Sequence, residues 1–464
     1  MSLKYYHNKI REYLFVSIFI IIFLQTFNIF PQVVEEWVAR YNSAGNGDDG
    51  AKDLALDQWG NIYVTGTGSG GFITVKYNNS GIQQWAVTHK TPGYDYSDAV
   101  ALGVDNAGNV YVTGGSYNSS NHRDYVTVKY NNSGVQQWFV TYDGTVYDDY
   151  VSDIAVDNLG NVYVTGNVAT SFTNLDCVAI KYNTDGIQQW IVVYDNIDNG
   201  NDGGNAIVLD NSGNVYIAGY SDFNVTSLDY LTIKYNNNGV QQWVSTYSGN
   251  SSGFEFAYSV VVDNSGNVYV TGSSWGTCDD IATVKYNSSG VQQWADRYNG
   301  VTNKYDVGNA IVVDDDYNVY VTGYANYDGF TDASDIITIK YNSLGTREWV
   351  ALYNGDKNIQ DQANAIALDI VGNVYVTGFT DYALIGGSPA DYVTIKYNNS
   401  SIQEWVMKYN GPGDGYDTSY DIALDDTNNV FITGRSGGVG TNSDYATIRY
   451  SPTPAFASNT FYFY

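Results

Sequence analysis

Beyond residue 34 the chain consists of short segments in which apolar and polar residues alternate, separated by turns rich in Asn and Gly. Asn109–Gly114, with the letters N-V-Y-V-T-G, is typical, and its alternation is that of a half-buried β-strand. Val, Ile, Thr and Tyr, which favour strands, outweigh the common helix formers. No segment shows helical periodicity, so the pattern predicts an all-β protein.

Three signatures recur at intervals of 48 to 56 residues, an interval typical of propeller blades and too long for most helical repeats. The first, D-x-x-G-N-V-Y-V-T-G, occupies Asp57–Gly66, Asp105–Gly114, Asp157–Gly166, Asp210–Gly219, Asp263–Gly272, Asp314–Gly323, Asp369–Gly378 and Asp425–Gly434. The second, T-[IV]-K-Y-N, contains Lys76, Lys129, Lys181, Lys234, Lys285, Lys340 and Lys396, with Arg449 last. The third, Q-Q-W, contains Trp85, Trp138, Trp190, Trp243, Trp294, Trp349 and Trp405.

Each repeated unit contains four predicted strands. In the third unit the first strand is Ile154–Asp157, and a turn whose Asn and Gly suit a tight hairpin follows it. The V-Y-V-T-G segment is the second strand, the Lys-bearing segment the third and the Trp-bearing segment the fourth. Four antiparallel strands per unit predict the radially arranged blades of a β-propeller.

The two ends of the chain complement each other. The eighth unit stops at Tyr450 without its Trp-bearing strand, and Glu35–Asn42 supplies a strand of that type at the other end. The sequence therefore predicts an eight-bladed β-propeller over residues 35–450, with four-stranded antiparallel blades. The N-terminal strand is expected to complete the last blade and close the ring.

The repeated Trp is interpreted as a packing residue of the outer blade rather than a platform for a cofactor. The repeated Lys is interpreted as a member of an internal ion pair or as part of a solvated strand edge.

In G-N-V-Y-V-T-G, K-Y-N-x-x-G and Q-Q-W the chain resembles the bacterial beta-propeller repeat (SBBP) proteins. The resemblance covers residues 35–450 and implies a propeller that is exported and has a recognition or surface role. The family takes its name from seven blades, whereas the repeats counted above predict eight.

Residues 1–34 differ from the rest. Lys4, Lys9 and Arg11 precede an apolar run from Tyr13 to Leu24, the arrangement of an export signal. An uncleaved N-terminal membrane anchor is the alternative, because apolar residues resume as far as position 30. We therefore expect a secreted, cell-surface or periplasmic protein, with no membrane association after cleavage and with a short tail at 451–464.

Charge and cysteine content narrow the options further. The formal net charge of −28 argues against a nucleic-acid partner, because few cations are present to neutralise phosphates. Cys177 and Cys278 fall on equivalent strands of the third and fifth units, too far apart for a disulfide. Two free thiols are predicted.

The turns within each unit alternate between uniform and variable. The connections from second to third strands differ in length and content, and such loops are where a rigid scaffold carries function. Their aromatic residues suit a glycan or an extracellular protein, although loops under weak constraint would vary in the same way. The predicted ligand-binding residues are Tyr117, Trp275, Tyr324, Tyr327, Phe330 and Tyr382.

The same face is expected to be acidic, because an Asp opens the third strand in every unit except the first. Carboxylate oxygens in this arrangement are suited to Ca²⁺, and no other cofactor is expected. Alternatively, each Asp accepts backbone N–H bonds at the start of its own strand. The candidate metal ligands are Asp124, Asp176, Asp229, Asp280, Asp335, Asp391 and Asp444.

No catalytic residue is predicted. Two G-x-S-x-G matches, at Gly272–Gly276 and Gly434–Gly438, do not precede a helix, and only His89 and His122 lie beyond the leader. The sequence favours an exported, non-enzymatic binding or adhesion module. The alternatives are a scaffold for envelope assembly and a glycoside hydrolase or lyase that uses paired carboxylates over the axis.

Overall fold

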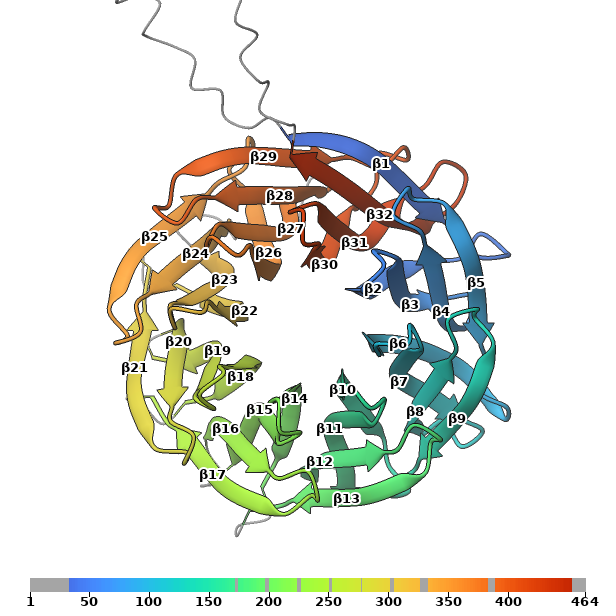
Figure 1. Ribbon diagram of the computed structural model, residues 1–464, viewed down its shortest axis with the longest axis horizontal. Coiled ribbons are helices and arrows are strands. Elements are labelled where there is room, and N and C mark those ends of the chain that lie inside the picture. The colour runs from blue at the N-terminus through green and yellow to red at the C-terminus, as the bar shows by residue number, and fades with distance from the viewer. Residues whose placement is uncertain are drawn as a thin grey trace, which may run out of the picture. The chain divides into compact units, whose positions relative to one another are not determined.

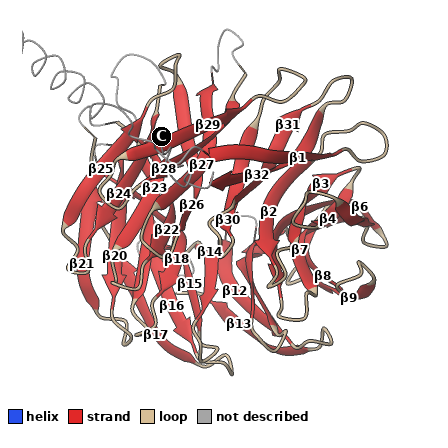
Figure 2. Cartoon of the chain, turned by 45° about the horizontal axis from the view of Figure 1, so that its top comes forward, coloured by secondary structure: helices blue, strands red, loops and turns tan. Residues whose placement is uncertain are grey.

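The computed structural model describes residues 33–171, 174–196, 200–222, 227–249, 253–276, 278–300, 304–325, 333–382 and 389–452. Every regular element in these ranges is a β-strand (Figure 2). The strands form eight four-stranded antiparallel sheets, which confirms the predicted all-β propeller with eight blades.

The blades follow the repeated units. The first four consist of β2(Gly50–Leu56), β3(Ile62–Gly68), β4(Gly71–Tyr77) and β5(Gln83–His89); β6(Tyr94–Val104), β7(Val110–Asn118), β8(Arg123–Tyr130) and β9(Gln136–Tyr142); β10(Asp149–Val156), β11(Val162–Ser171), β12(Asn174–Tyr182) and β13(Gln188–Tyr194); and β14(Asp202–Leu209), β15(Val215–Asp222), β16(Leu228–Tyr235) and β17(Gln241–Tyr247). The last four consist of β18(Glu255–Val262), β19(Val268–Trp275), β20(Asp279–Tyr286) and β21(Gln292–Tyr298); β22(Asp306–Val313), β23(Val319–Ala325), β24(Asp335–Tyr341) and β25(Arg347–Tyr353); β26(Gln360–Leu368), β27(Val374–Tyr382), β28(Asp391–Tyr397) and β29(Gln403–Tyr409); and β30(Thr418–Leu424), β31(Val430–Gly437), β32(Ser443–Pro452) and β1(Val33–Tyr41).

The blades form a closed ring (Figure 1). The first strand of each blade lies next to the central axis and the fourth strand lies on the rim. The eighth sheet has the order β1-β32-β31-β30, so the N-terminal strand completes the last blade as predicted.

The last Gly of V-Y-V-T-G permits a close approach between the first two strands of a blade. A Cβ on Gly166 would lie 2.1 Å from the carbonyl oxygen of Tyr150 on the opposite strand. At the same level each first strand carries a β-bulge, for example between Val151 and Asp153. Bulges increase the local twist of a sheet.

The turn between the first and second strands is stabilised by its own Asp. In blade one the Asp57 carboxylate accepts hydrogen bonds from the backbone N–H groups of Trp59 and Asn61, the Asn61 amide and the Tyr63 hydroxyl. The same Asp and Asn contacts recur in blade eight, where Phe431 replaces the Tyr. These local bonds explain why the signature is uniform around the ring.

Neighbouring blades are joined by a Tyr, a Lys and a Trp. In blade two the Lys129 ammonium lies 4.9 Å from the Tyr111 ring centroid and donates to the Thr184 carbonyl of blade three at 2.9 Å. The Trp138 indole N–H donates to the same carbonyl at 2.9 Å. The Lys is therefore chiefly an inter-blade donor above an aromatic ring. Only the copies Lys340 and Lys396 also form ion pairs in the described part of the chain.

The apolar core lies between blades rather than within each one. Each buried cluster combines side chains of two neighbouring blades, as in the packing of Tyr63 from blade one with Val110, Val112 and Val126 of blade two. The repeated Trp packs at the outer edge of these clusters, half-buried, as Trp85 does beside Tyr63.

Cys177 and Cys278 are free, as predicted, and Cys177 is buried. Among the described residues no helix is long and apolar enough to cross a membrane. The predicted leader, residues 1–34, lies outside the described ranges except for its last two positions.

Candidate functional site

The two faces of the ring differ in their connections. One face, called the uniform face, carries turns such as 57–61 and 131–135, which repeat with the same hydrogen bonds. The opposite face, called the variable face, carries the connections from second to third strands, such as 118–123. It also carries the connections between successive blades, such as 143–148. Hollows on the uniform face recur between equivalent turns of blades three and four and of blades six and seven. These hollows arise from the repeated turns themselves and so do not mark a specific site. The variable face is therefore the better candidate for a binding site.

The predicted aromatic residues lie on separate blades. Tyr117 lies near the end of the second strand of blade two, and its ring centroid is 6.3 Å from that of Tyr96. Trp275 is the last residue of the second strand of blade five. Tyr324 is on blade six, where burial raises its pKa to about 12. Tyr382 is on blade seven, packed against Phe379 and Tyr416. Tyr327 and Phe330 lie outside the described residues.

A second set of aromatic residues, which the sequence analysis did not select, lies on the first strands. Tyr96, Tyr150 and Tyr258 are 45%, 37% and 39% exposed, and Tyr420 is half-buried. Tyr150, Tyr258 and Tyr420 each lie next to the residue that pairs with the last Gly of V-Y-V-T-G, at or beside the bulge, whereas Tyr96 lies three residues before its equivalent, Ala99. The signal in the sequence was therefore a Tyr within three residues of that position, in four of the first strands.

An open hollow on the variable face lies over blades two to four and has a volume of about 530 Å³. Its lining includes Asn121, His122, Tyr147, Asp148, Tyr150 and Asn201.

The Tyr150 ring in this hollow is held in place. Its hydroxyl donates to the Asp148 carboxylate at 3.1 Å, and the Arg123 guanidinium lies 5.2 Å from the ring centroid. The other oxygen of Asp148 accepts the Arg123 backbone N–H at 2.9 Å and lies 3.9 Å from the His122 ring nitrogen. The hollow thus presents an ordered ring beside carboxylate, amide and imidazole groups.

A smaller hollow of about 300 Å³ lies over blades eight, one and two, and its lining includes the cationic side chains of Lys52 and Arg435. The Lys52 ammonium lies 4.2 Å from the Tyr420 ring centroid, and burial together with the nearby Arg435 lowers its pKa. Asp98, also in this lining, forms an ion pair with Arg123 at 2.6 Å. Arg123 therefore connects the two hollows.

Three carboxylates lie on the first strands, near the axis. The Asp53, Asp153 and Asp421 carboxylates accept the backbone N–H groups of Leu102, Ile207 and Leu54, each on the next blade. Asp53 also hydrogen-bonds to Asp421. Burial raises the pKa of both Asp53 and Asp421, and the hydrogen bond between the two carboxyls requires that one of them carries a proton.

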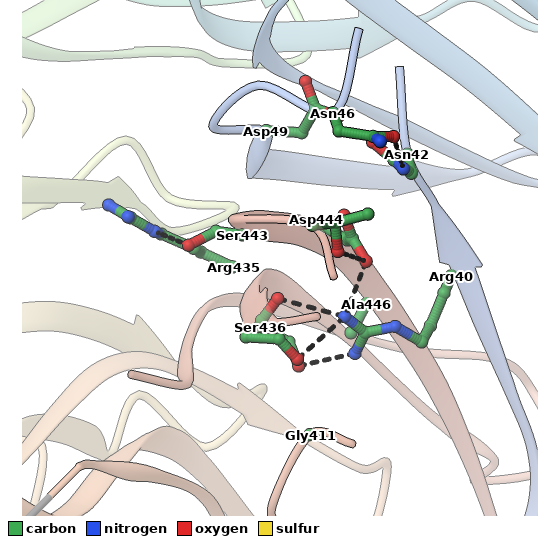
Figure 3. A network of polar contacts seen from close by, with 12 residues as sticks. Arg40, Asn42, Asn46, Asp49, Gly411, Arg435, Ser436, Ser443, Asp444 and Ala446 are labelled. Carbon is green, nitrogen blue, oxygen red and sulfur yellow. Dashed lines mark hydrogen bonds and ion pairs between the residues drawn. The ribbon is translucent and has the colours of Figure 1, made fainter. Parts of the chain in front are cut away.

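The seven candidate metal ligands occur one per blade around the ring, so they do not converge on one site. Asp280 is bound by Arg297 at 2.8 Å. Asp444 is bound by Arg40 at 2.9 Å (Figure 3). Asp124 accepts from the Tyr94 hydroxyl at 2.7 Å. The remaining four are Asp176, which is buried, and the half-buried Asp229, Asp335 and Asp391.

A second acidic series, at the start of the first strands, is fully buried and receives the backbone N–H bonds that were considered for the first series. Asp149, for example, accepts from the N–H of Gly144 at 2.7 Å and of Ala169 at 3.2 Å. Glu255 and Asp361 belong to this series, and the sequence analysis selected none of its members as a site. Its members are Asp49, Asp149, Asp202, Glu255, Asp306, Asp361 and Asp417, and Ser97 takes the place in blade two.

The family comparison agrees with this architecture. The beta-propeller repeat model of the SBBP family matches residues 139–167, 245–277 and 348–382. Each match begins in the fourth strand of one blade and runs through the second strand of the next, at every second blade. The chain contains SBBP repeats.

A curated relative of this SBBP repeat protein is an uncharacterized WD repeat-containing protein of Acanthamoeba polyphaga mimivirus. It is 22% identical in an alignment that covers 66% of this chain and 31% of the relative. The SBBP chain thus spans about a third of that relative's length.

Among solved structures, the SBBP repeat protein is similar to a quinohemoprotein alcohol dehydrogenase from Pseudomonas putida HK5. The TM-score is 0.53 and the identity 11%, over 91% of this chain and 77% of that one. The polysaccharide lyase Uly1 is also similar, with a TM-score of 0.46 and 10% identity over 87% and 90% of the two chains. At these identities the likeness concerns the fold alone.

Proposed function

We propose that this SBBP repeat protein is an exported, non-enzymatic binding module that recognises a glycan through the variable face. The observation that carries the proposal is the hollow of about 530 Å³ over blades two to four. Ligand sites in proteins are concave and combine apolar or aromatic surface with a few oriented polar groups. The Tyr147 and Tyr150 rings offer surface for the apolar face of a sugar, and Asn121, Asn201 and Asp148 offer hydrogen bonds to its hydroxyls.

Two features support binding at this place. The hollow is formed by connections that differ from blade to blade, whereas the turns on the uniform face repeat. Asp148 and Arg123 hold the Tyr150 ring in the free protein, which reduces the entropy lost when a ligand packs against it.

The test is a screen of the purified chain on an array of glycans and extracellular-matrix proteins. We expect saturable binding to a glycan that weakens at least tenfold in Tyr150→Ala. The matched control is Trp59→Ala, which removes a 55% exposed aromatic side chain from the uniform face and should leave binding unchanged. Binding only to a protein, or glycan binding that Tyr150→Ala leaves intact, would contradict the proposal.

The bonded pair Asp53 and Asp421 favours a second candidate, a glycoside hydrolase or lyase, because one carboxyl is protonated and its neighbour ionised. Both groups also accept N–H bonds that join blades. Polysaccharide cleavage by the wild type that falls by orders of magnitude in both Asp53→Asn and Asp421→Asn, with unchanged melting temperatures, would favour catalysis over binding.

A further inference from the structure

Two groups of three carboxylates meet at equivalent places on the variable face. Asp124, Asp143 and Asp149 each offer an oxygen within 4.8 Å of the others, between blades two and three. Asp176, Asp195 and Asp202 do the same between blades three and four.

The two groups are built alike. Asp143 and Asp195 each follow the Tyr that ends a fourth strand, and the next residue donates its backbone N–H to the buried Asp of the following blade. In the other six blades this position is Lys90, Ser248, Asn299, Asn354, Asn410 or Asn42. The third carboxylate is thus confined to two blade junctions.

An unpartnered atom lies in the first group. Asp124 is 1% exposed, and its Oδ2 accepts from Tyr94 and Asn118, but its Oδ1 has no hydrogen-bond partner. A buried, unpartnered carboxylate oxygen beside two further carboxylates is unfavourable unless a cation or a proton neutralises it.

Two other blades neutralise the equivalent Asp with an Arg from the residue before the last Tyr of the fourth strand. Arg297 of blade five binds Asp280. Arg40 of blade eight binds Asp444 (Figure 3). In blades two and three that residue is Thr141 or Val193. At these two junctions the chain has an Asp after the last Tyr of the fourth strand and no cation before it, whereas blades four and six have neither.

We propose that these two carboxylate groups each bind a divalent cation, Ca²⁺, through oxygen ligands from Asp124, Asp143 and Asp149 and from Asp176, Asp195 and Asp202. Hard, flexible coordination by carboxylate and backbone oxygens suits Ca²⁺ better than transition metals, which favour nitrogen and sulfur ligands. Each cation would link the third strand of one blade, its outgoing connection and the first strand of the next. This inference is independent of the proposed glycan site.

The test is calorimetric titration of the chelator-treated protein with CaCl₂ at pH 7.5. We expect two Ca²⁺ per chain, one in Asp143→Asn, one in Asp195→Asn and none in the double variant. Both Asp residues are exposed, so the variants should fold. Asp185→Asn, which removes an exposed carboxylate from the uniform face, should retain two.

A gain-of-charge variant tests the same idea without removing a ligand. Val193→Arg would supply Asp176 with the guanidinium that Arg297 gives Asp280, and should leave one Ca²⁺ per chain. Absence of any binding or melting-temperature increase at millimolar Ca²⁺ would overturn the proposal. Binding that persists at two Ca²⁺ in the double Asn variant would overturn it as well.

Discussion

At the residue scale, the turn between the third and fourth strands depends on one left-handed residue. Gly134, with φ +78°, is typical, and a Cβ there would lie 2.8 Å from the Trp85 ring of the preceding blade. Glycine therefore serves both the backbone conformation and the packing of the repeated Trp. In blade seven this position is Ser401, with φ +66°.

We expect Ser401→Gly to stabilise the protein by about 0.5–1 kcal/mol, because the left-handed cost of a non-Gly residue exceeds the entropy that glycine adds to the unfolded chain. The Ser401 hydroxyl has no hydrogen bond that the change would remove among those described. The measurement is the denaturation midpoint in urea. Ser133→Gly, at an exposed turn position without positive φ, should be neutral or slightly destabilising; equal gains in both variants would contradict the argument.

At the element scale, the repeat was sufficient to predict the strands, the blades and the closure by β1. Those features depend on local patterns that recur, such as the Asp57 turn, and repetition averages out ambiguity in any one copy.

The candidate sites were harder to predict because they combine residues from different strands and blades. Asp124 is on the third strand of blade two and Asp149 opens blade three, so only the packing of the two blades brings their carboxylates together. The exposed Tyr258 was missed because it is the extra residue of a β-bulge, and a bulge breaks the alternation of buried and exposed side chains.

Closure by β1 gives a prediction about the whole strand. A variant lacking residues 1–41 leaves β32 as an unpaired edge, and exposed edges recruit other strands. We expect it to form oligomers in size-exclusion chromatography, whereas a variant lacking only residues 1–32 should not.

Strand 33–42 added as a synthetic peptide should restore the monomer. The same peptide with Trp37→Ala should do so less well, because the Trp37 indole donates to the Asn79 carbonyl of blade one. A monomeric, equally stable 42–464 variant would contradict closure by this strand.

At the scale of the whole molecule, the excess of acidic residues destabilises the folded state. The chain has a net charge of −28, and several carboxylates become buried when the blades assemble. Burial raises the pKa of Asp153 to about 6 and that of Glu255 to about 7. Asp229 raises the pKa of Glu255 further, while Arg297 and the Gly249 N–H oppose the shift.

A carboxyl whose pKa is higher in the folded than in the unfolded state binds more protons when folded, so its effect on stability is lost as the pH rises through the folded value. We therefore expect the melting temperature to fall between pH 5 and pH 8. Glu255→Gln should flatten this dependence: it removes a charge whose Oε2 is buried without a partner, so it should stabilise the protein at pH 8 and change little at pH 5. Asp185→Asn also removes one negative charge, but from an exposed position, so it should keep the wild-type slope. Adding 0.5 M NaCl should reduce only the part of the slope that is due to surface repulsion. If the melting temperature of Glu255→Gln falls between pH 5 and pH 8 as much as that of the wild type, the pH dependence arises from surface charge instead.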